Sequence, residues 1–241
     1  MNISKKPEML LGSIIKSEQK RIRALLFDFD GVMADTMRYH LAAWEQVLSA
    51  HYGFHLDEMV VKLNEGRPVL QIAQAIFRAA AQPHTEELLR TCIAEKSLVF
   101  KHTHQAKVYP ENRQIIERAR SQGILVGLVT GTFRKNLALV LPEPWMQLFD
   151  VIITDGDTLQ GKPFPDPYLA AAERLNVLPT ECVAIENAPL GIQSAKAAGM
   201  VCIAVQTTLP EEHLKQADVI VATHAELLLH LTAGFFCGFP V

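Results

Sequence analysis

Two aspartates separated by one residue close a short apolar segment near the start of the chain. Residues 24–30 read ALLFDFD, and Asp28 and Asp30 are the acidic members of this segment. In extended backbone, residues two apart point to the same side, so one carboxylate could attack phosphorus while the second gives and takes protons. Gly31 follows and permits a sharp turn with no side chain to crowd a ligand. The pair alone also occurs in metal-binding glycosyltransferases and in turn or helix caps, so its spacing leaves these alternatives open.

Other side chains capable of chemistry stand at the ends of later apolar segments or in the loops between them. They are Thr130 with its neighbours Gly131 and Thr132, then Lys162, Glu186 and Asn187. Carboxylates suit Mg²⁺, which prefers oxygen ligands and retains several waters. A lysine and a hydroxyl suit a phosphoryl group, whose negative charge must be matched during transfer. The set as a whole indicates phosphoryl-transfer chemistry with Mg²⁺.

The order of predicted strands and helices explains how these distant residues can meet. Apolar segments predict five buried strands and a weaker sixth, at residues 24–30, 124–129, 151–154, 182–185, 201–205 and 218–221. Helical patterns lie between them, at residues 111–122, 166–175 and 190–198. This alternation is typical of an α/β fold with a doubly wound parallel sheet. Ligands of such sheets bind beyond the carboxyl ends of the strands, where we expect the polar residues to converge.

Residues 36–108 interrupt this alternation. They show helical periodicity and no convincing strand, which favours a separate helical unit inserted after the first strand. Such an insertion would lie over the crevice at the strand ends as a lid. We therefore predict a helical cap domain at residues 36–108, a Rossmann-like core domain formed by residues 23–35 and 109–241, and an N-terminal extension at residues 1–22.

The composition is that of a globular protein and argues against several kinds of partner. The 241 residues include 23 basic and 26 acidic side chains, for a formal net charge of −3, and 49% are hydrophobic. Because there is no long basic run, we expect no nucleic-acid groove and no binding to an anionic membrane surface. The four cysteines form no CxxC pair, which indicates buried thiols in a reducing compartment.

The apolar segments near both ends are short. Residues 9–15 are closed by Lys16, and His230 and Thr232 interrupt residues 227–241, whereas a spanning helix needs roughly 20 apolar residues. We expect no secretory signal, no membrane span and a cytoplasmic location. The last segment would either pack on the body of the protein or mediate a dimer, so we expect a monomer or a weak homodimer.

Four motifs occur in order along the chain. They read LLFDFDGVMADT, VTGT, GKPFPDPY and AIENAPLGIQSAKAAGM. Together they resemble the four motifs of the haloacid dehalogenase-like (HAD) phosphotransferase superfamily, and the resemblance extends from Arg23 to about His224. Further matches resemble the β-phosphoglucomutase-type branch, whose helical cap lies between the first two motifs; they are Asp35, Thr36, Tyr39, His40, Trp44, Gly66, Arg67 and Lys96. The resemblance implies Mg²⁺-dependent transfer of a phosphoryl group from a small phosphorylated metabolite.

The resemblance also implies a role for each matching residue. Asp28 would be the nucleophile and Asp30 the acid/base, while Thr130 and Lys162 would hold the transferring phosphoryl group. The metal would be held by Asp28, Asp30, Glu186 and Asn187. Substrate contacts would come from His40, Glu65, Arg67, Lys96, Gly131 and Thr132. For Glu65, a surface carboxylate is an equally consistent interpretation, since only its place beside Arg67 directs it to the crevice.

Asn187 departs from the family pattern, because many relatives have an aspartate there. Its amide oxygen can still bind Mg²⁺, but one negative charge is lost, which bears on metal affinity more than on reaction type. It also lowers repulsion of a more anionic substrate. We expect a phosphatase first, with a sugar-phosphate mutase and an inorganic pyrophosphatase as alternatives. A phosphoryl-binding regulator with weak turnover is the alternative from a different class, although such a switch has no need of Asp30.

Overall fold

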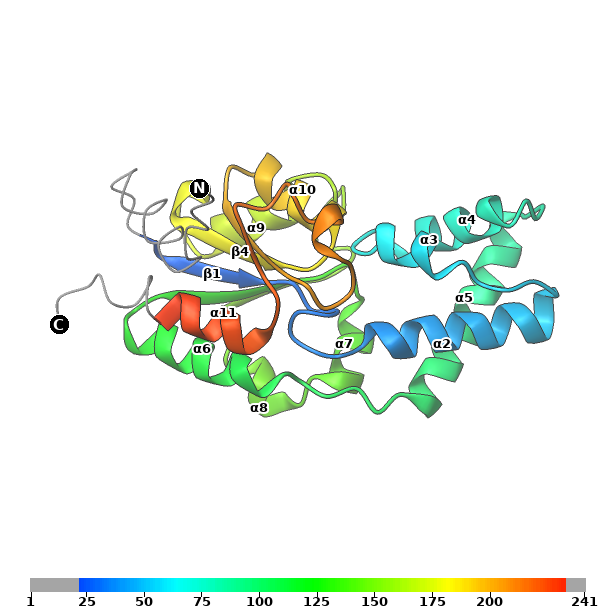
Figure 1. Cartoon of the computed structure of the whole chain (residues 1–241), viewed down its shortest axis with the longest axis horizontal. Helices are drawn as coiled ribbons and strands as arrows, with labels where there is room; N and C mark the ends of the chain where they lie inside the picture. The colour runs from blue at the N-terminus through cyan, green and yellow to red at the C-terminus, as the bar shows by residue number, and fades with distance from the viewer. Residues whose placement is uncertain (1–21, 233–241) are drawn as a thin grey trace, which may run out of the picture.

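A six-stranded parallel sheet forms the centre of the protein (Figure 1). The computed structural model describes residues 22–232. The strands are β1 (Ala24–Phe27), β2 (Leu125–Val129), β3 (Val151–Ile153), β4 (Cys182–Glu186), β5 (Val201–Val205) and β6 (Val219–Val221). Their order is β3-β2-β1-β4-β5-β6, and every pairing is parallel. The chain winds outward in both directions from β1, so the predicted doubly wound α/β fold is confirmed, with its crevice between β1 and β4.

Helices cover both faces of this sheet (Figure 1). One face packs against α6 (Pro110–Ser121) and α11 (His224–His230), and the other against α9 (Asp166–Arg174) and α10 (Pro189–Ala197). Successive strand residues point to opposite faces, so Leu25 and Phe27 of β1 join the first cluster while Ala24 and Leu26 join the second. This is why the strands read as uninterrupted apolar runs in the sequence. The shorter elements are α7 (Arg134–Val140), α8 (Glu143–Met146) and the 3₁₀ turns Pro179–Glu181 and Glu211–His213.

The predicted first strand, residues 24–30, is wrong in its last three residues. The strand ends at Phe27, and Gly31 then turns the chain with a φ of +78°. The backbone N–H groups of Val32, Met33 and Ala34 all donate to the Phe29 carbonyl oxygen, which closes a tight loop. Asp30 therefore lies on this loop beyond the strand, and its position follows from the turn. Asp28 directly follows the strand, and its N–H still donates to the Ile185 carbonyl oxygen of β4 at 2.9 Å.

The segment between β1 and α6 is built of helices, as predicted for residues 36–108. Its elements are α2 (Met37–Val47), the π-helical turn Leu48–Tyr52, α3 (Glu58–Leu63), α4 (Val69–Ala79) and α5 (Glu86–Thr103). These helices, which we call the cap, enclose an apolar cluster of their own around Trp44, Phe77 and Leu89. The chain leaves and re-enters the core side by side, since Ala34 and Val108 form an isolated antiparallel bridge. The domain boundaries given above stay a prediction.

The predictions about the cysteines and the apolar segments concern residues that the structure describes only in part. Cys92, Cys182 and Cys202 are buried free thiols, as expected. Within residues 22–232, no helix is both long and apolar enough to cross a membrane. Cys237, the N-terminal extension up to residue 21 and the tail from residue 233 lie outside the described residues.

Candidate active site

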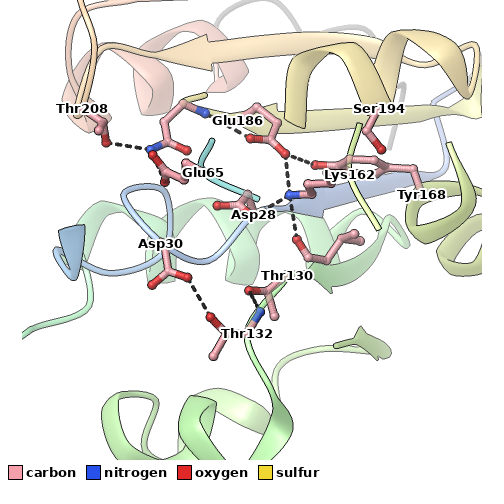
Figure 2. Close-up of polar contacts among 12 residues, drawn as sticks. Asp28, Asp30, Glu65, Thr130, Thr132, Lys162, Tyr168, Glu186, Ser194 and Thr208 are labelled. Carbon is pink, nitrogen blue, oxygen red and sulfur yellow. Dashed lines mark hydrogen bonds and ion pairs between the residues drawn. The ribbon is translucent and has the colours of Figure 1, made fainter. Parts of the chain in front are cut away.

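Lys162 lies between two carboxylates at the carboxyl ends of the central strands (Figure 2). Asp28 follows β1, Glu186 is the last residue of β4, and Lys162 precedes α9. Lys162 Nζ is 2.6 Å from Asp28 Oδ1 and 2.6 Å from Glu186 Oε1, and it donates to the Val129 carbonyl oxygen at 3.2 Å. All three side chains are buried. Burial alone would lower the pKa of Lys162, but the two carboxylates hold it above its ordinary value, so the lysine stays charged.

The carboxylates around Asp28 carry more negative charge than the single ammonium of Lys162 can balance. Burial is the largest effect and raises the pKa of Asp28, and the carboxylates of Glu186 and Asp30 raise it further, while Lys162 lowers it. The net result is a pKa well above the ordinary value of an aspartate. An added positive charge would favour the ionised form that a nucleophile requires. The electrostatics of Asp28 therefore suit a site that also holds a cation.

Asp30 accepts hydrogen bonds from both sides of the crevice. Thr36 Oγ1 donates to Asp30 Oδ1 at 2.6 Å, and Thr132 Oγ1 donates to Asp30 Oδ2 at 2.9 Å. His40 Nε2 lies 3.3 Å from Oδ1. Burial would raise the pKa of Asp30, but the hydrogen bond and charge of His40, together with the two threonine hydroxyls, lower it to about 2. In this state Asp30 is ionised and can accept a proton.

A chain of polar contacts extends from Asp30 into the cap. Lys96 Nζ, on α5, lies 2.7 Å from His40 Nδ1, and the His40 ring stacks on Phe100 with a centroid distance of 4.1 Å. Burial lowers the pKa of Lys96 to about 8, although Asp30 acts in the opposite direction. Burial and the charge of Lys96 also lower the pKa of His40. A His40 ring that accepts from Lys96 at Nδ1 donates to Asp30 from Nε2.

Lys96→Met should stabilise the protein at pH 7. A pKa of about 8, against an ordinary 10.5, means that the buried ammonium destabilises the fold below pH 8. Its removal should raise the free energy of unfolding by about 1–3 kcal/mol at pH 7, since one pKa unit corresponds to about 1.4 kcal/mol. The gain should shrink as the pH rises from 8 towards 10.5, where wild-type Lys96 is neutral. Urea unfolding at pH 7 and pH 10 measures this difference.

The matched control for this prediction is Lys101→Met, because Lys101 is exposed on the same helix. Its stability should equal that of the wild type within a few tenths of a kcal/mol at both pH values. A loss of stability in Lys96→Met that is equal at pH 7 and pH 10 would show that Lys96 contributes packing rather than a strained charge.

Glu65, a buried acid of the cap, lies close to Thr208 of the core (Figure 2), and Asn187 bonds to both. Glu65 follows α3 and is only 6% exposed. Asn187 Nδ2 donates to Glu65 Oε1 at 2.9 Å and to Thr208 Oγ1 at 2.8 Å. Glu65 Oε2 and Asn187 Oδ1 are buried without a hydrogen-bond partner. Burial first and the charge of Asp28 second raise the pKa of Glu65 well above its ordinary value, so this acid also lacks a nearby positive charge.

These unpartnered oxygens fit a metal ion. No three His, Cys, Asp or Glu side chains within residues 22–232 form a metal cluster by themselves, so a metal would depend on the Asn187 amide as well as on carboxylates. Mg²⁺ accepts such a mixture because it binds carboxylate and amide oxygens and retains several waters. The available donors are the four ligands predicted from the sequence, Asp28, Asp30, Glu186 and Asn187, with Glu65 as an additional candidate.

Two glycines allow the cap to rest directly on the core. A Cβ on Gly131 would lie 2.8 Å from the carbonyl oxygen of Gly66 in the cap. A Cβ on Gly66, whose φ is +90°, would lie 2.9 Å from Lys162 Cδ. Neither position tolerates a side chain without displacement of its neighbours, so these glycines permit the loop that carries Glu65 to close over Lys162.

The cap and the core together enclose a cavity of about 560 Å³. Eight of the residues predicted from the sequence line it: Asp28, Asp30, His40, Glu65, Arg67, Lys96, Gly131 and Thr132. A smaller pocket of about 60 Å³ beside it is lined by Thr130, Gly131 and Lys162. Thr130 Oγ1 accepts the backbone N–H of Thr132 at 3.0 Å, which fixes this loop. The structure thus brings the predicted residues to one place.

Several contributors were missed from the sequence. Tyr168 donates to Glu186 Oε1 at 2.6 Å, and only its place in the GKPFPDPY motif marked it. Thr208 supports Asn187, and no local pattern singles it out. The apolar wall of the cavity, with Phe133 and Leu139 among its members, was also missed, because apolar residues at helical spacing read as ordinary core.

Comparisons with known proteins agree with the geometry. A family model described as haloacid dehalogenase-like hydrolase matches residues 22–199. The chain is 32% identical over 193 residues to fructose-1-phosphate phosphatase YqaB of Escherichia coli, covering 78% of this chain and 98% of that protein. It is 27% identical over 218 residues to β-phosphoglucomutase of Bacillus subtilis, covering 87% and 93%. A solved structure of β-phosphoglucomutase from Clostridium difficile gives a TM-score of 0.72 at 26% identity, covering 86% of this chain and 93% of that one.

Proposed function

Because the chain belongs to the haloacid dehalogenase-like hydrolase family, in which its relatives are phosphatases and phosphosugar mutases, we propose that it is a Mg²⁺-dependent phosphatase of a small phosphorylated metabolite. The observation that carries the proposal is the pairing of Asp28 with Lys162 at 2.6 Å beside the cavity. A buried carboxylate held against an ammonium is arranged to attack phosphorus while the ammonium balances the phosphoryl oxygens.

In the proposed mechanism, Asp28 attacks the phosphorus and the bond from phosphorus to the ester oxygen breaks. The leaving oxygen takes a proton from Asp30, and Lys162 and Thr130 bind the phosphoryl oxygens. A water then attacks phospho-Asp28, gives its proton to Asp30, and orthophosphate leaves. The pKa of Asp30 is about 2 without substrate, and the negative phosphate would raise it, so the substrate itself prepares the acid.

Mg²⁺, when bound by the oxygens of Asp28, Asp30 and Asn187, would neutralise charge on the nucleophile and on the phosphoryl group. The chain's own residues orient Asp28 through Lys162, and the cavity beside it leaves room for the water that hydrolyses phospho-Asp28. The test is a panel of phosphorylated metabolites with and without Mg²⁺, measured as release of orthophosphate. Release from none of them in the presence of Mg²⁺ would contradict the proposal.

Metal dependence yields a direct prediction. Activity should be lost in excess EDTA and restored by Mg²⁺, and Asn187→Asp should bind Mg²⁺ more tightly because it restores a carboxylate beside Asp28. Titration calorimetry with Mg²⁺ alone measures the affinity without turnover. Unchanged affinity in Asn187→Asp would show that this residue does not approach the ion, and full activity in EDTA would exclude the proposed metal site.

A sugar-phosphate mutase is the second candidate, favoured by the contacts of Lys96 with His40 and of His40 with Asp30. These two contacts connect Asp30, the proposed acid/base, to the cap. A cap held against the core would exclude water, and this would favour transfer of the phosphoryl group to a sugar hydroxyl. The discriminating assay uses β-glucose 1-phosphate with a trace of the 1,6-bisphosphate. Glucose 6-phosphate as the main product means mutase, and free phosphate means phosphatase. Pyrophosphate belongs in the same panel, because Glu65 could help to hold a cation on a diphosphate.

A further inference from the structure

The large cavity is apolar along most of its wall. Asp30, His40 and Lys96 form one connected polar part of it, and Arg67, Ser97 and Asn136 also line it. Beyond them the wall consists mainly of apolar side chains, among them Trp44, Leu70, Ile93 and Phe100 from the cap and Phe133 and Leu139 from the core. Besides the residues predicted from the sequence, three further charged side chains line it, of which Asp155 is half-buried and Arg90 and Lys135 are exposed. Arg90 is bonded to Glu86 at 2.6 Å, and Lys135 lies 6.0 Å from the centre of the Phe133 ring.

This space remains although the cap already touches the core. Glu65 of the cap is hydrogen-bonded to Asn187 of the core at 2.9 Å. The carbonyl of Gly66 lies so close to Gly131 that a Cβ there would approach it to 2.8 Å. About 560 Å³ is within the range of pockets that hold a ligand of drug size, roughly 300–1,000 Å³. The cavity is therefore space that remains, partly open to solvent, when the cap rests on the core.

We propose that the site takes phosphomonoesters whose alcohol carries an apolar body, an alkyl chain or an aromatic ring, that extends from Asp30 along this wall. This inference rests on the proposed phosphatase activity and names its substrate class. Phe133 and Leu139 are 41% and 38% exposed, and an apolar body would remove their side chains from water. A sugar or a second phosphate that extended along Leu70, Ile93 and Phe100 would instead place polar groups against side chains that offer them no hydrogen bonds.

The reaction is hydrolysis and needs no co-reactant besides water. The bond between phosphorus and the ester oxygen breaks, and the apolar alcohol leaves with the proton of Asp30. Phosphorus is now bonded to Asp28; water attacks it, the bond from phosphorus to Asp28 breaks to release orthophosphate, and a proton of that water returns to Asp30. The phosphoryl group stays at Asp28, Thr130 and Lys162, while the wall contacts only the alcohol. The residues that cleave the ester bond and the residues that select the alcohol therefore lie in different parts of the cavity.

A series of primary alkyl phosphates tests this separation, because ethyl, butyl and hexyl phosphate have leaving groups of similar reactivity. kcat/KM should rise roughly three- to fourfold for each methylene that enters the wall. 2-Phenylethyl phosphate distinguishes an aromatic from an aliphatic preference. β-Glucose 1-phosphate and pyrophosphate are the polar comparisons, and hexyl phosphate should exceed both in kcat/KM.

Leu139→Ser introduces a polar group into the wall at a half-exposed position of α7 that the core does not need. It should lower the ratio of kcat/KM for hexyl phosphate to that for ethyl phosphate by at least threefold. The matched control is Leu169→Ser, since Leu169 is 39% exposed on α9 and does not line the cavity. That control should leave the ratio unchanged. Calorimetry with ethylphosphonate and hexylphosphonate, which are not hydrolysed, measures the same preference as binding.

The outcomes separate the two proposals. Equal kcat/KM across the alkyl series, or equal effects of Leu139→Ser and Leu169→Ser, would overturn the apolar substrate class while leaving the phosphatase in place. If no ester or metabolite releases orthophosphate, the phosphatase proposal fails, and the phosphonates alone decide the inference. Tighter binding of hexylphosphonate than of ethylphosphonate would then support an apolar ligand, and equal binding would refute it.

Discussion

Replacing Asp28 by Asn should reduce turnover by ~10⁴-fold or more, because the loss of a nucleophile normally costs several orders of magnitude. The fold should survive, since the amide has nearly the same shape and its oxygen can still accept the hydrogen bond from Lys162. Burial raises the pKa of Asp28, so its ionised form is costly at neutral pH and the variant should melt no lower than the wild type. Orthophosphate release and thermal unfolding measure the two effects separately.

Asp57→Asn is the matched control for this substitution. Asp57 caps α3 through its side chain, lies outside the cavity, and asparagine caps a helix equally well. Its activity should equal that of the wild type. Wild-type protein should also form an acid-stable, base-labile phosphoenzyme that Asp28→Asn does not form. Activity of Asp28→Asn above about one per cent of wild type would rule out the covalent mechanism.

Lys162→Met should both inactivate and destabilise the protein. Lys162 is the ammonium between Asp28 and Glu186, and its loss leaves two buried carboxylates facing each other. Removal of one partner from a buried ion pair typically costs about 3–5 kcal/mol. The pKa of Asp28, which Lys162 lowers in the wild type, should rise further in the variant. A raised carboxyl pKa means that stability is lost as the pH rises, so the difference from the wild type should narrow towards pH 4.

Urea unfolding of four proteins tests this account. The double variant Lys162→Met/Asp28→Asn should recover part of the lost stability, because it removes one of the two unpaired charges. Lys196→Met is the control, since Lys196 forms a comparably short but partly exposed ion pair with Asp218. It should cost about 0–1 kcal/mol. Equal losses in Lys162→Met and Lys196→Met, or no recovery in the double variant, would show that Lys162 does not balance buried charge.

The sequence was sufficient for the sheet and for the chemistry at the ends of its strands. The three helices predicted between strands begin and end within one residue of α6, α9 and α10, because apolar periodicity and helix-ending glycines act over a few residues. A parallel sheet brings the carboxyl ends of its strands together whatever the length of the connections. Asp28 and Glu186 could therefore be expected to meet, and the pairing of β1 with β4 aligns them.

Tertiary structure alone decided how these residues are paired. Asp28 and Asp30 are similar by spacing, yet Asp28 stays in line with β1 and bonds to Lys162. Asp30 lies on the loop that turns at Gly31 and bonds to Thr36 and Thr132. The two aspartates consequently have pKa values shifted in opposite directions. Such a division depends on which groups approach within hydrogen-bonding distance, and those groups come from segments far apart in the chain.

The cap shows the same limit most clearly. Periodicity in the sequence predicted that the cap is helical. The resemblance to a family predicted that Arg67, Lys96 and His40 contact the substrate. The hydrogen bond from Asn187 to Glu65 and the apolar cavity could not be predicted from the sequence. A cavity wall and a core are built from the same apolar side chains at the same helical spacing, so composition cannot separate them. Only the packing of the cap against the core leaves some of those side chains without a partner.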